Sequence, residues 1–137
     1  MARILIIEDD LDFVESLRLP LESRGHQVEV AESGKVGLQK VKEFEPDLII
    51  LDVMMETDTE GFHVAYQLRN PDPSSEYAKY SDIPIIMLTA ISQKTKMAFD
   101  PKKDEDFLPV DEFIEKPVRP DVLLEKVEKL LKEKGKA

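Results

Sequence analysis

Five short runs of apolar residues recur along the chain, and each of them predicts a β-strand. The run DLIILD is apolar without alternation, which is typical of a strand buried on both faces. The run HQVEVA alternates weakly and is expected at an edge of the sheet. In chain order the predicted strands cover Arg3 to Glu8, His26 to Ala31, Asp47 to Asp52, Ile83 to Thr89 and Val110 to Glu115.

Apolar residues at helical spacing lie between these strands. Pro20 falls inside the first predicted helix, where it should kink the axis or split the helix into two turns, and Gly25 follows as a stop. Ser33 is the predicted N-cap of the second helix. The helices are expected over Asp12 to Arg24, after Ser33, from Phe62 to Arg69 and from Pro120 to Lys134.

The alternation of strands and helices predicts an α/β fold. We expect a doubly wound, five-stranded parallel sheet in the flavodoxin-like order 2-1-3-4-5, with helices on both faces. The chain has 137 residues, so residues 1–137 are expected to form a single domain with no output domain. Two stretches rich in Pro, Asp, Lys and Ser, Arg69 to Asp82 and Ala98 to Pro109, are predicted to be loops or insertions.

The composition excludes several classes of protein. The chain has no cysteine, so neither a disulfide framework nor a zinc–thiolate site is possible. Its net charge of −10 disfavours direct binding to nucleic acid, which needs a basic surface. No apolar run approaches the roughly 18 residues of a membrane span, and the start shows no signal-peptide pattern. We therefore expect a cytoplasmic protein that does not insert into membranes.

Carboxylates follow two strands that the predicted order makes neighbours. Glu8, Asp9 and Asp10 come at the end of the first strand, and Asp52 ends the third. Ligands of such sheets bind beyond the carboxyl ends of the strands where the strand order reverses, which here is between these two strands. Closely spaced carboxylates repel, and a hard divalent cation, Mg²⁺ (or Mn²⁺), would relieve the repulsion. The alternative is that these residues only cap the following helices.

A hydroxyl and an ammonium group are predicted at the same edge of the sheet. Thr89 ends the fourth strand and Lys116 follows the fifth. Each is weak evidence alone, because a Thr at this place is commonly an N-cap and a Lys in a loop is commonly solvated. Together with Asp52 and a divalent cation they are the groups needed for phosphoryl transfer to an aspartate.

Four segments, RILIIEDD, PDLIILDVMM, IIMLTA and FIEKP, occur in this order at the ends of four strands. With them the chain resembles the receiver domain of two-component response regulators over essentially its whole length. The resemblance implies that Asp52 is the phosphoacceptor, and that Thr89 and Lys116 are the catalytic groups that hold the phosphoryl oxygens.

The same resemblance implies a metal site and a switch. Phe113 occupies the place of the aromatic that turns inward when Thr89 moves toward the phosphate, although plain core packing is the alternative. The bond between Lys116 and Pro117 resembles one that is cis in this family. The metal ligands would be Glu8, Asp9, Asp52 and the backbone carbonyl of Met54.

The function implied by this resemblance is a phosphorylation-dependent signalling switch. The domain would accept a phosphoryl group from a histidine kinase or a histidine phosphotransfer protein and signal through contacts with a downstream protein. It would assist its own phosphotransfer and dephosphorylation rather than act as an enzyme on another substrate. The alternatives are a receiver-like scaffold that is never phosphorylated, a phosphate sink or relay, and a metal-dependent phosphohydrolase. The last would need an Asp at the position of Met54 as general acid.

The sequence departs from the family pattern at three places. Glu56 stands where the family usually has Pro. The segment Arg69 to Asp82 reads as an insertion, whose Tyr77 and Tyr80 could dock on the body of the domain or on a partner. The stretch Ser92 to Pro109 reads largely as a loop where the family has its fourth helix, which is part of the usual output face.

Overall fold

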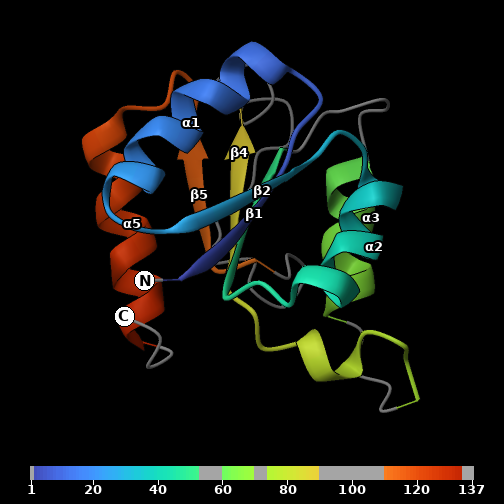
Figure 1. The fold of residues 1–137 in the computed structure, drawn as a ribbon. Coiled ribbons are helices and arrows are strands. Elements are labelled where there is room, and N and C mark those ends of the chain that lie inside the picture. Colours follow the sequence, from blue (N-terminus) through green and yellow to red (C-terminus); the bar gives the residue numbers. More distant parts are fainter. Residues whose placement is uncertain (1, 53–59, 70–73, 90–109, 134–137) are drawn as a thin grey trace.

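A computed structural model describes residues 2–52, 60–69, 74–89 and 110–133 (Figure 1). The predicted ends of the strands and helices differ from the observed ones by at most two residues, and the predicted loop at 98–109 lies outside the described residues. In the described ranges no helix is long and apolar enough to cross a membrane. The elements are β1 (Arg3–Ile7), α1 (Leu11–Ser23), β2 (Gln27–Ala31), α2 (Gly34–Phe44), β3 (Leu48–Asp52), α3 (Glu60–Leu68), the 3₁₀ helix η1 (Ala78–Tyr80), β4 (Ile85–Thr89), β5 (Glu112–Glu115) and α5 (Pro120–Glu133).

The five strands form one parallel sheet in the predicted order β2-β1-β3-β4-β5. The register pairs Ile7 with Leu51 and Asp52 with Leu88, so β1, β3 and β4 end at the same edge of the sheet. The strand order reverses between β1 and β3, and a crevice is expected beyond their carboxyl ends. This topology is what brings residues far apart in the sequence to one place.

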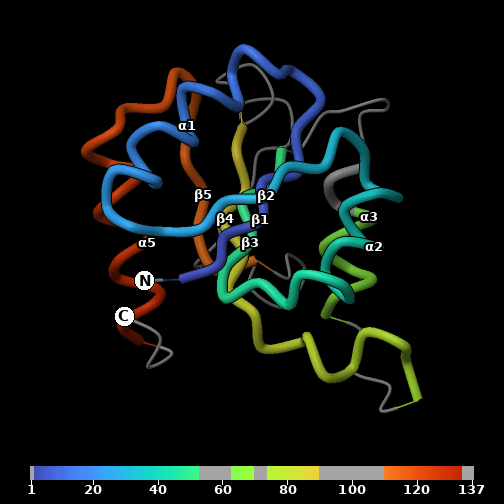
Figure 2. The backbone as a smooth tube through the Cα atoms, in the orientation of Figure 1, coloured from blue at the N-terminus to red at the C-terminus, as the bar shows by residue number. Residues whose placement is uncertain are grey.

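Helices cover both faces of the sheet, α1 and α5 on one side and α2 and α3 on the other (Figure 2). Ile4 and Ile6 of β1 pack in the layer beneath α1 and α5, whereas Leu5 and Ile7 pack in the layer beneath α2 and α3. Successive side chains of a strand point to opposite faces, so a strand covered on both sides must be apolar throughout. The run Leu48–Asp52 is buried at every position, as the unbroken apolar pattern predicts.

Of the two outcomes predicted for Pro20, a kink or a split, the split does not occur: α1 is continuous from Leu11 to Ser23. Leu17 and Leu21, on either side of Pro20, are fully buried in the core, and their packing holds both parts of the helix on the sheet. The predicted stop at Gly25 is confirmed, with a φ of 86°. The positive φ explains the glycine, because a Cβ there would be strained.

The described part of the segment after α3, residues 74–84 with η1, docks on the domain at the side that α2 and α3 cover (Figures 1 and 2). Tyr80 is buried in the core layer beneath α2 and α3, and Tyr77 packs against the same layer. Lys42 at the end of α2 forms an ion pair with Glu76 and lies 4.9 Å from the centre of the Tyr77 ring. The two tyrosines therefore dock on the body of the domain, which is one of the two possibilities that the sequence left open.

The partly buried guanidinium of Arg69 fastens this segment to the sheet. It donates to the carbonyl oxygens of Ser81 and Ile83, the latter at 2.6 Å, and forms an ion pair with Asp111. The same Asp111 oxygen accepts the backbone N–H of Ile85 at 2.8 Å. One charged pair thus joins the end of α3, the inserted segment and the starts of β4 and β5.

Candidate functional site

The carboxyl edge of the sheet carries an unusual group of buried polar side chains. Glu8 directly follows β1, Asp52 ends β3 and Thr89 ends β4, and they are 1%, 2% and 0% exposed. Within the described ranges these are the buried polar or charged residues, and all three lie at this one edge. Burying polar groups is costly unless they are paired, so their gathering at one place indicates a functional site.

Three carboxylates converge at this edge. Oxygen atoms of Glu8, Asp9 and Asp52 all lie within 4.8 Å of one another, with Asp9 exposed and the other two buried. Glu8 is held in place because its Oε2 accepts the backbone N–H groups of Asp9 at 2.8 Å and Asp10 at 3.3 Å. Asp10 instead caps α1 by accepting the N–H of Phe13 at 3.2 Å. The capping alternative therefore holds for Asp10 but leaves the other three carboxylates unexplained.

The electrostatics of the cluster favour a proton or a cation. Burial raises the pKa of Glu8 from its ordinary value of 4.5 to about 8, and the hydrogen bond and the repulsion from Asp52 act in the same direction. The positive charge of Lys116 lowers this pKa and offsets part of the effect. Glu8 therefore keeps its proton at neutral pH unless another positive charge takes the proton's place.

Lys116 brings a positive charge to both buried acids. Its Nζ lies 3.1 Å from Oδ2 of Asp52 and 3.5 Å from Oε1 of Glu8. Its backbone N–H donates to the carbonyl of Thr89 at 2.7 Å, which ties the ends of β4 and β5 together. The bond to Pro117 is cis, as expected.

The Thr89 hydroxyl is buried and has no hydrogen-bond partner in the part of the chain that the structure describes. A buried hydroxyl without a partner costs free energy, so such a group in a folded protein needs an explanation. At this edge the Thr89 hydroxyl could donate a hydrogen bond to an oxygen of a bound anion.

The three carboxylates fit a hard divalent cation. Mg²⁺ and Mn²⁺ prefer oxygen ligands, and Mg²⁺ keeps several waters, so few protein ligands suffice. Glu8, Asp9 and Asp52 offer such oxygens close together, and the exposed Asp9 leaves one side of the cluster open to solvent. Met54, the fourth expected ligand, lies outside the described residues.

Two aromatic residues belong to elements that carry or flank these groups. Phe113 is half-buried and packs against the core layer beneath α2 and α3, which fits the packing alternative and leaves its switch role a prediction. Phe13 was not predicted as a site residue, yet the centre of its ring lies 4.7 Å from Nζ of Lys116. The one signal in the sequence was its position in the first turn of the helix that follows the acidic residues.

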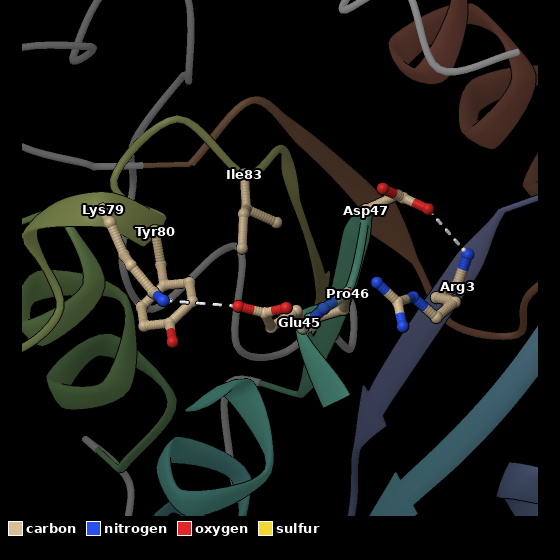
Figure 3. A pocket seen from close by; sticks show the side chains of 7 residues that line it. All are labelled: Arg3, Glu45, Pro46, Asp47, Lys79, Tyr80 and Ile83. Atoms are coloured by element: carbon tan, nitrogen blue, oxygen red, sulfur yellow. Dashed lines mark hydrogen bonds and ion pairs between the residues drawn. The ribbon is translucent and has the colours of Figure 1, made fainter. Parts of the chain in front are cut away.

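A hollow with a volume of about 320 Å³ lies at the opposite edge of the sheet, where β1 and β3 begin (Figure 3). Its charged groups already have partners. Glu45 pairs with Lys79 at 3.3 Å, Asp47 accepts the backbone N–H of Arg3 at 2.9 Å, and the Arg3 guanidinium lies 5.7 Å from the centre of the Phe44 ring. The hollow contains none of the buried acids, so the carboxyl edge remains the candidate site.

Residues 4–128 match the family described as "Response regulator receiver domain". The chain belongs to this family. The receiver fold is also found in similar solved structures. A signal receiver domain of a histidine kinase from Syntrophus aciditrophicus is 30% identical, with a TM-score of 0.77 over 97% of this chain and 92% of that one. A CheY-like receiver domain protein from Methanospirillum hungatei is 28% identical, with a TM-score of 0.75 over 100% of this chain and 99% of that one.

Curated relatives of this receiver domain include proteins of different length. "Protein PilH" of Pseudomonas aeruginosa is 35% identical over 115 residues, which are 82% of this chain and 89% of that protein. "Transcriptional regulatory protein AfsQ1" of Streptomyces coelicolor is 33% identical over 132 residues, or 96% of this chain. The chain spans only 52% of the length of AfsQ1, so the activity of the whole of that protein is not assigned to this chain.

Proposed function

We propose that this receiver domain is a signalling switch that accepts a phosphoryl group on Asp52 from a phosphohistidine. The donor would be a histidine kinase or a histidine phosphotransfer protein, and the output a contact with a downstream protein. One observation carries the proposal: a buried Asp52 carboxylate lies 3.1 Å from the Lys116 ammonium, at the edge where the buried Thr89 hydroxyl has no partner among the described residues. A cytoplasmic location is part of this proposal.

The transfer step needs a carboxylate nucleophile and compensation of charge. An oxygen of Asp52 forms the new P–O bond while the P–N bond to the donor histidine breaks, and the bonding pair stays on the ring nitrogen, which takes up a proton. Mg²⁺ or Mn²⁺ bound by Glu8, Asp9 and Asp52 would neutralise charge on the phosphoryl oxygens. A nucleophile buried beside another carboxylate is otherwise poorly placed to receive an anionic group.

After the transfer the donors at the site change partners. The Asp52 oxygen that carries the phosphoryl group has lost its charge, so the Lys116 ammonium moves from the carboxylate to a phosphoryl oxygen. The Thr89 hydroxyl donates a hydrogen bond to another phosphoryl oxygen and so gains a partner. The new charge thereby biases the ends of β4 and β5, where Phe113 would follow Thr89 inward.

Intact-mass spectrometry tests the proposal. Incubation with acetyl phosphate and Mg²⁺ should add one phosphoryl group, and chelation of the metal or the change Asp52→Asn should abolish the gain. Asp82→Asn is the matched control, because it removes an exposed aspartate that precedes β4, at the opposite edge of the sheet from the site. Phosphorylation that persists in Asp52→Asn contradicts the assignment, and no gain in the parent protein favours the unphosphorylated scaffold.

A further inference from the structure

We infer that Phe13 is a positioning residue for Lys116 in the phosphotransfer reaction, an inference that rests on the proposed function. The ring of Phe13 lies against the Lys116 ammonium with 4.7 Å between Nζ and the ring centre. The two residues come from opposite ends of the chain, and their contact joins the first turn of α1 to the residue that follows β5.

The Phe13 ring is itself held in place from two sides. Its backbone N–H donates to the capping carboxylate of Asp10 at 3.2 Å, which fixes the first turn of α1. Its half-buried side chain packs against the core layer beneath α1 and α5. A ring fixed in this way offers the ammonium one preferred face rather than a moving surface.

The ammonium needs such a support because its stem is long and has several rotatable bonds. The Lys116 side chain is 29% exposed, so solvent competes with Asp52 and Glu8 for the ammonium. The face of an aromatic ring attracts a cation electrostatically and occupies space that water would otherwise fill. Phe13 therefore restricts the ammonium to positions near the two buried carboxylates.

An aromatic partner suits the change of partners that the reaction requires. A carboxylate holds Lys116 through directed hydrogen bonds, which must break when the ammonium moves from Asp52 to a phosphoryl oxygen. The attraction of the ring is not tied to one N–H direction, so Phe13 holds the ammonium before, during and after this move. The ring accepts no proton and does not compete with the phosphoryl group for the donor.

The contact has a spectroscopic signature that needs neither metal nor phosphoryl donor. In protein with ¹³C-labelled lysine, the ε-methylene signal of Lys116, assigned with Lys116→Arg, should lie upfield because of the ring current of Phe13. The shift should be lost in Phe13→Leu, which retains an apolar side chain, and retained in Phe13→Tyr. A Lys116 signal at the position of a solvated lysine in the parent protein overturns the inference even if neither Phe13 variant folds.

The kinetic test uses acetyl phosphate, so that a docking surface for a protein donor plays no part. Phe13→Leu should slow labelling of Asp52 about 3- to 10-fold, and Phe13→Tyr should restore the parent rate. Tyr77→Leu is the matched control, because it removes a ring 4.9 Å from the ammonium of Lys42 far from the site. This control should leave both the rate and the Lys116 signal unchanged.

The outcomes separate the inference from the proposed function. Labelling of Asp52 at equal rates in the parent and Phe13→Leu overturns the role of Phe13 and leaves the phosphoacceptor in place. A slow Phe13→Tyr also overturns it, because a general need for packing would then explain the loss. A parent protein that takes up no phosphoryl group refutes the proposed function and the inference with it.

Discussion

The buried Glu8 predicts that this domain loses stability as the pH rises from acid to mildly alkaline values. The pKa of Glu8 is about 8 in the folded chain, against an ordinary value of 4.5. Between these values the folded state keeps a proton that the unfolded state has released, so unfolding releases a proton and a higher pH favours it. The stabilising effect is fully present below pH 4.5 and is lost as the pH passes through 8.

The size of this effect follows from the two pKa values. One pKa unit corresponds to about 1.4 kcal/mol, so the interval from 4.5 to about 8 sets an upper value of roughly 5 kcal/mol. After burial, the hydrogen bond and the repulsion from the neighbouring Asp52 are the next causes that raise the pKa of Glu8. A loss of about 3 to 5 kcal/mol is large against the total stability of an ordinary domain.

Urea unfolding of metal-free protein between pH 5 and 9 measures this loss, with Glu8→Gln as the reference. Glutamine copies the protonated acid, so the stability of the parent should fall relative to this variant as the pH rises. Glu15→Gln, at an exposed position of α1, is the control and should follow the parent. Saturating Mg²⁺ should remove the loss if it replaces the proton. Parallel curves for the parent and Glu8→Gln would refute the reasoning.

Three further predictions concern the packing of the domain, and each is checked by equilibrium unfolding. Arg69→Met should lower the free energy of unfolding by about 3 kcal/mol, because it leaves the partly buried Asp111 carboxylate without its cation; a loss below about 1 kcal/mol would contradict this. Gly37→Ala should lower the free energy of unfolding by about 1 to 3 kcal/mol, since a Cβ there would lie 2.5 Å from Cδ1 of Ile7. Ile7→Val should therefore destabilise the Gly37→Ala variant less than it destabilises the parent, and additive losses would argue against the clash. Burial lowers the pKa of His26, so stability should fall as the pH drops below 6.5, and His26→Gln should remove this fall; an unchanged slope would show that another group titrates.

The fold and the location of the site could be predicted from the sequence for simple physical reasons. Unbroken apolar runs need cover on both faces, and strands that alternate with helices favour a parallel sheet. Parallel strands end at the same edge, so Glu8, Asp52 and Thr89 had to meet once the strand order was known. Local signals such as the Ser33 cap and the Gly25 stop were also sufficient, because the residues involved are neighbours in the chain.

Other features depend on contacts between distant segments, and only the tertiary structure decided them. The sequence EDD does not say which acid turns inward, whereas in the fold Glu8 is buried, Asp9 is exposed and Asp10 caps α1. The raised pKa of Glu8 follows from that burial and from Asp52 beside it. Pro20 stays within one helix because the packing of its neighbours outweighs its local preference.

The contacts of Lys116 and Arg69 are also features that only the tertiary structure decided. The ring of Phe13 and the ammonium of Lys116 meet only because α1 and the end of β5 lie side by side at the carboxyl edge, and nothing in either local sequence indicates the other. Arg69 likewise finds Asp111 at the start of β5 only after the sheet has formed. Hydrophobic periodicity determines which face of an element is buried, but the partner of a polar side chain is set by three-dimensional packing.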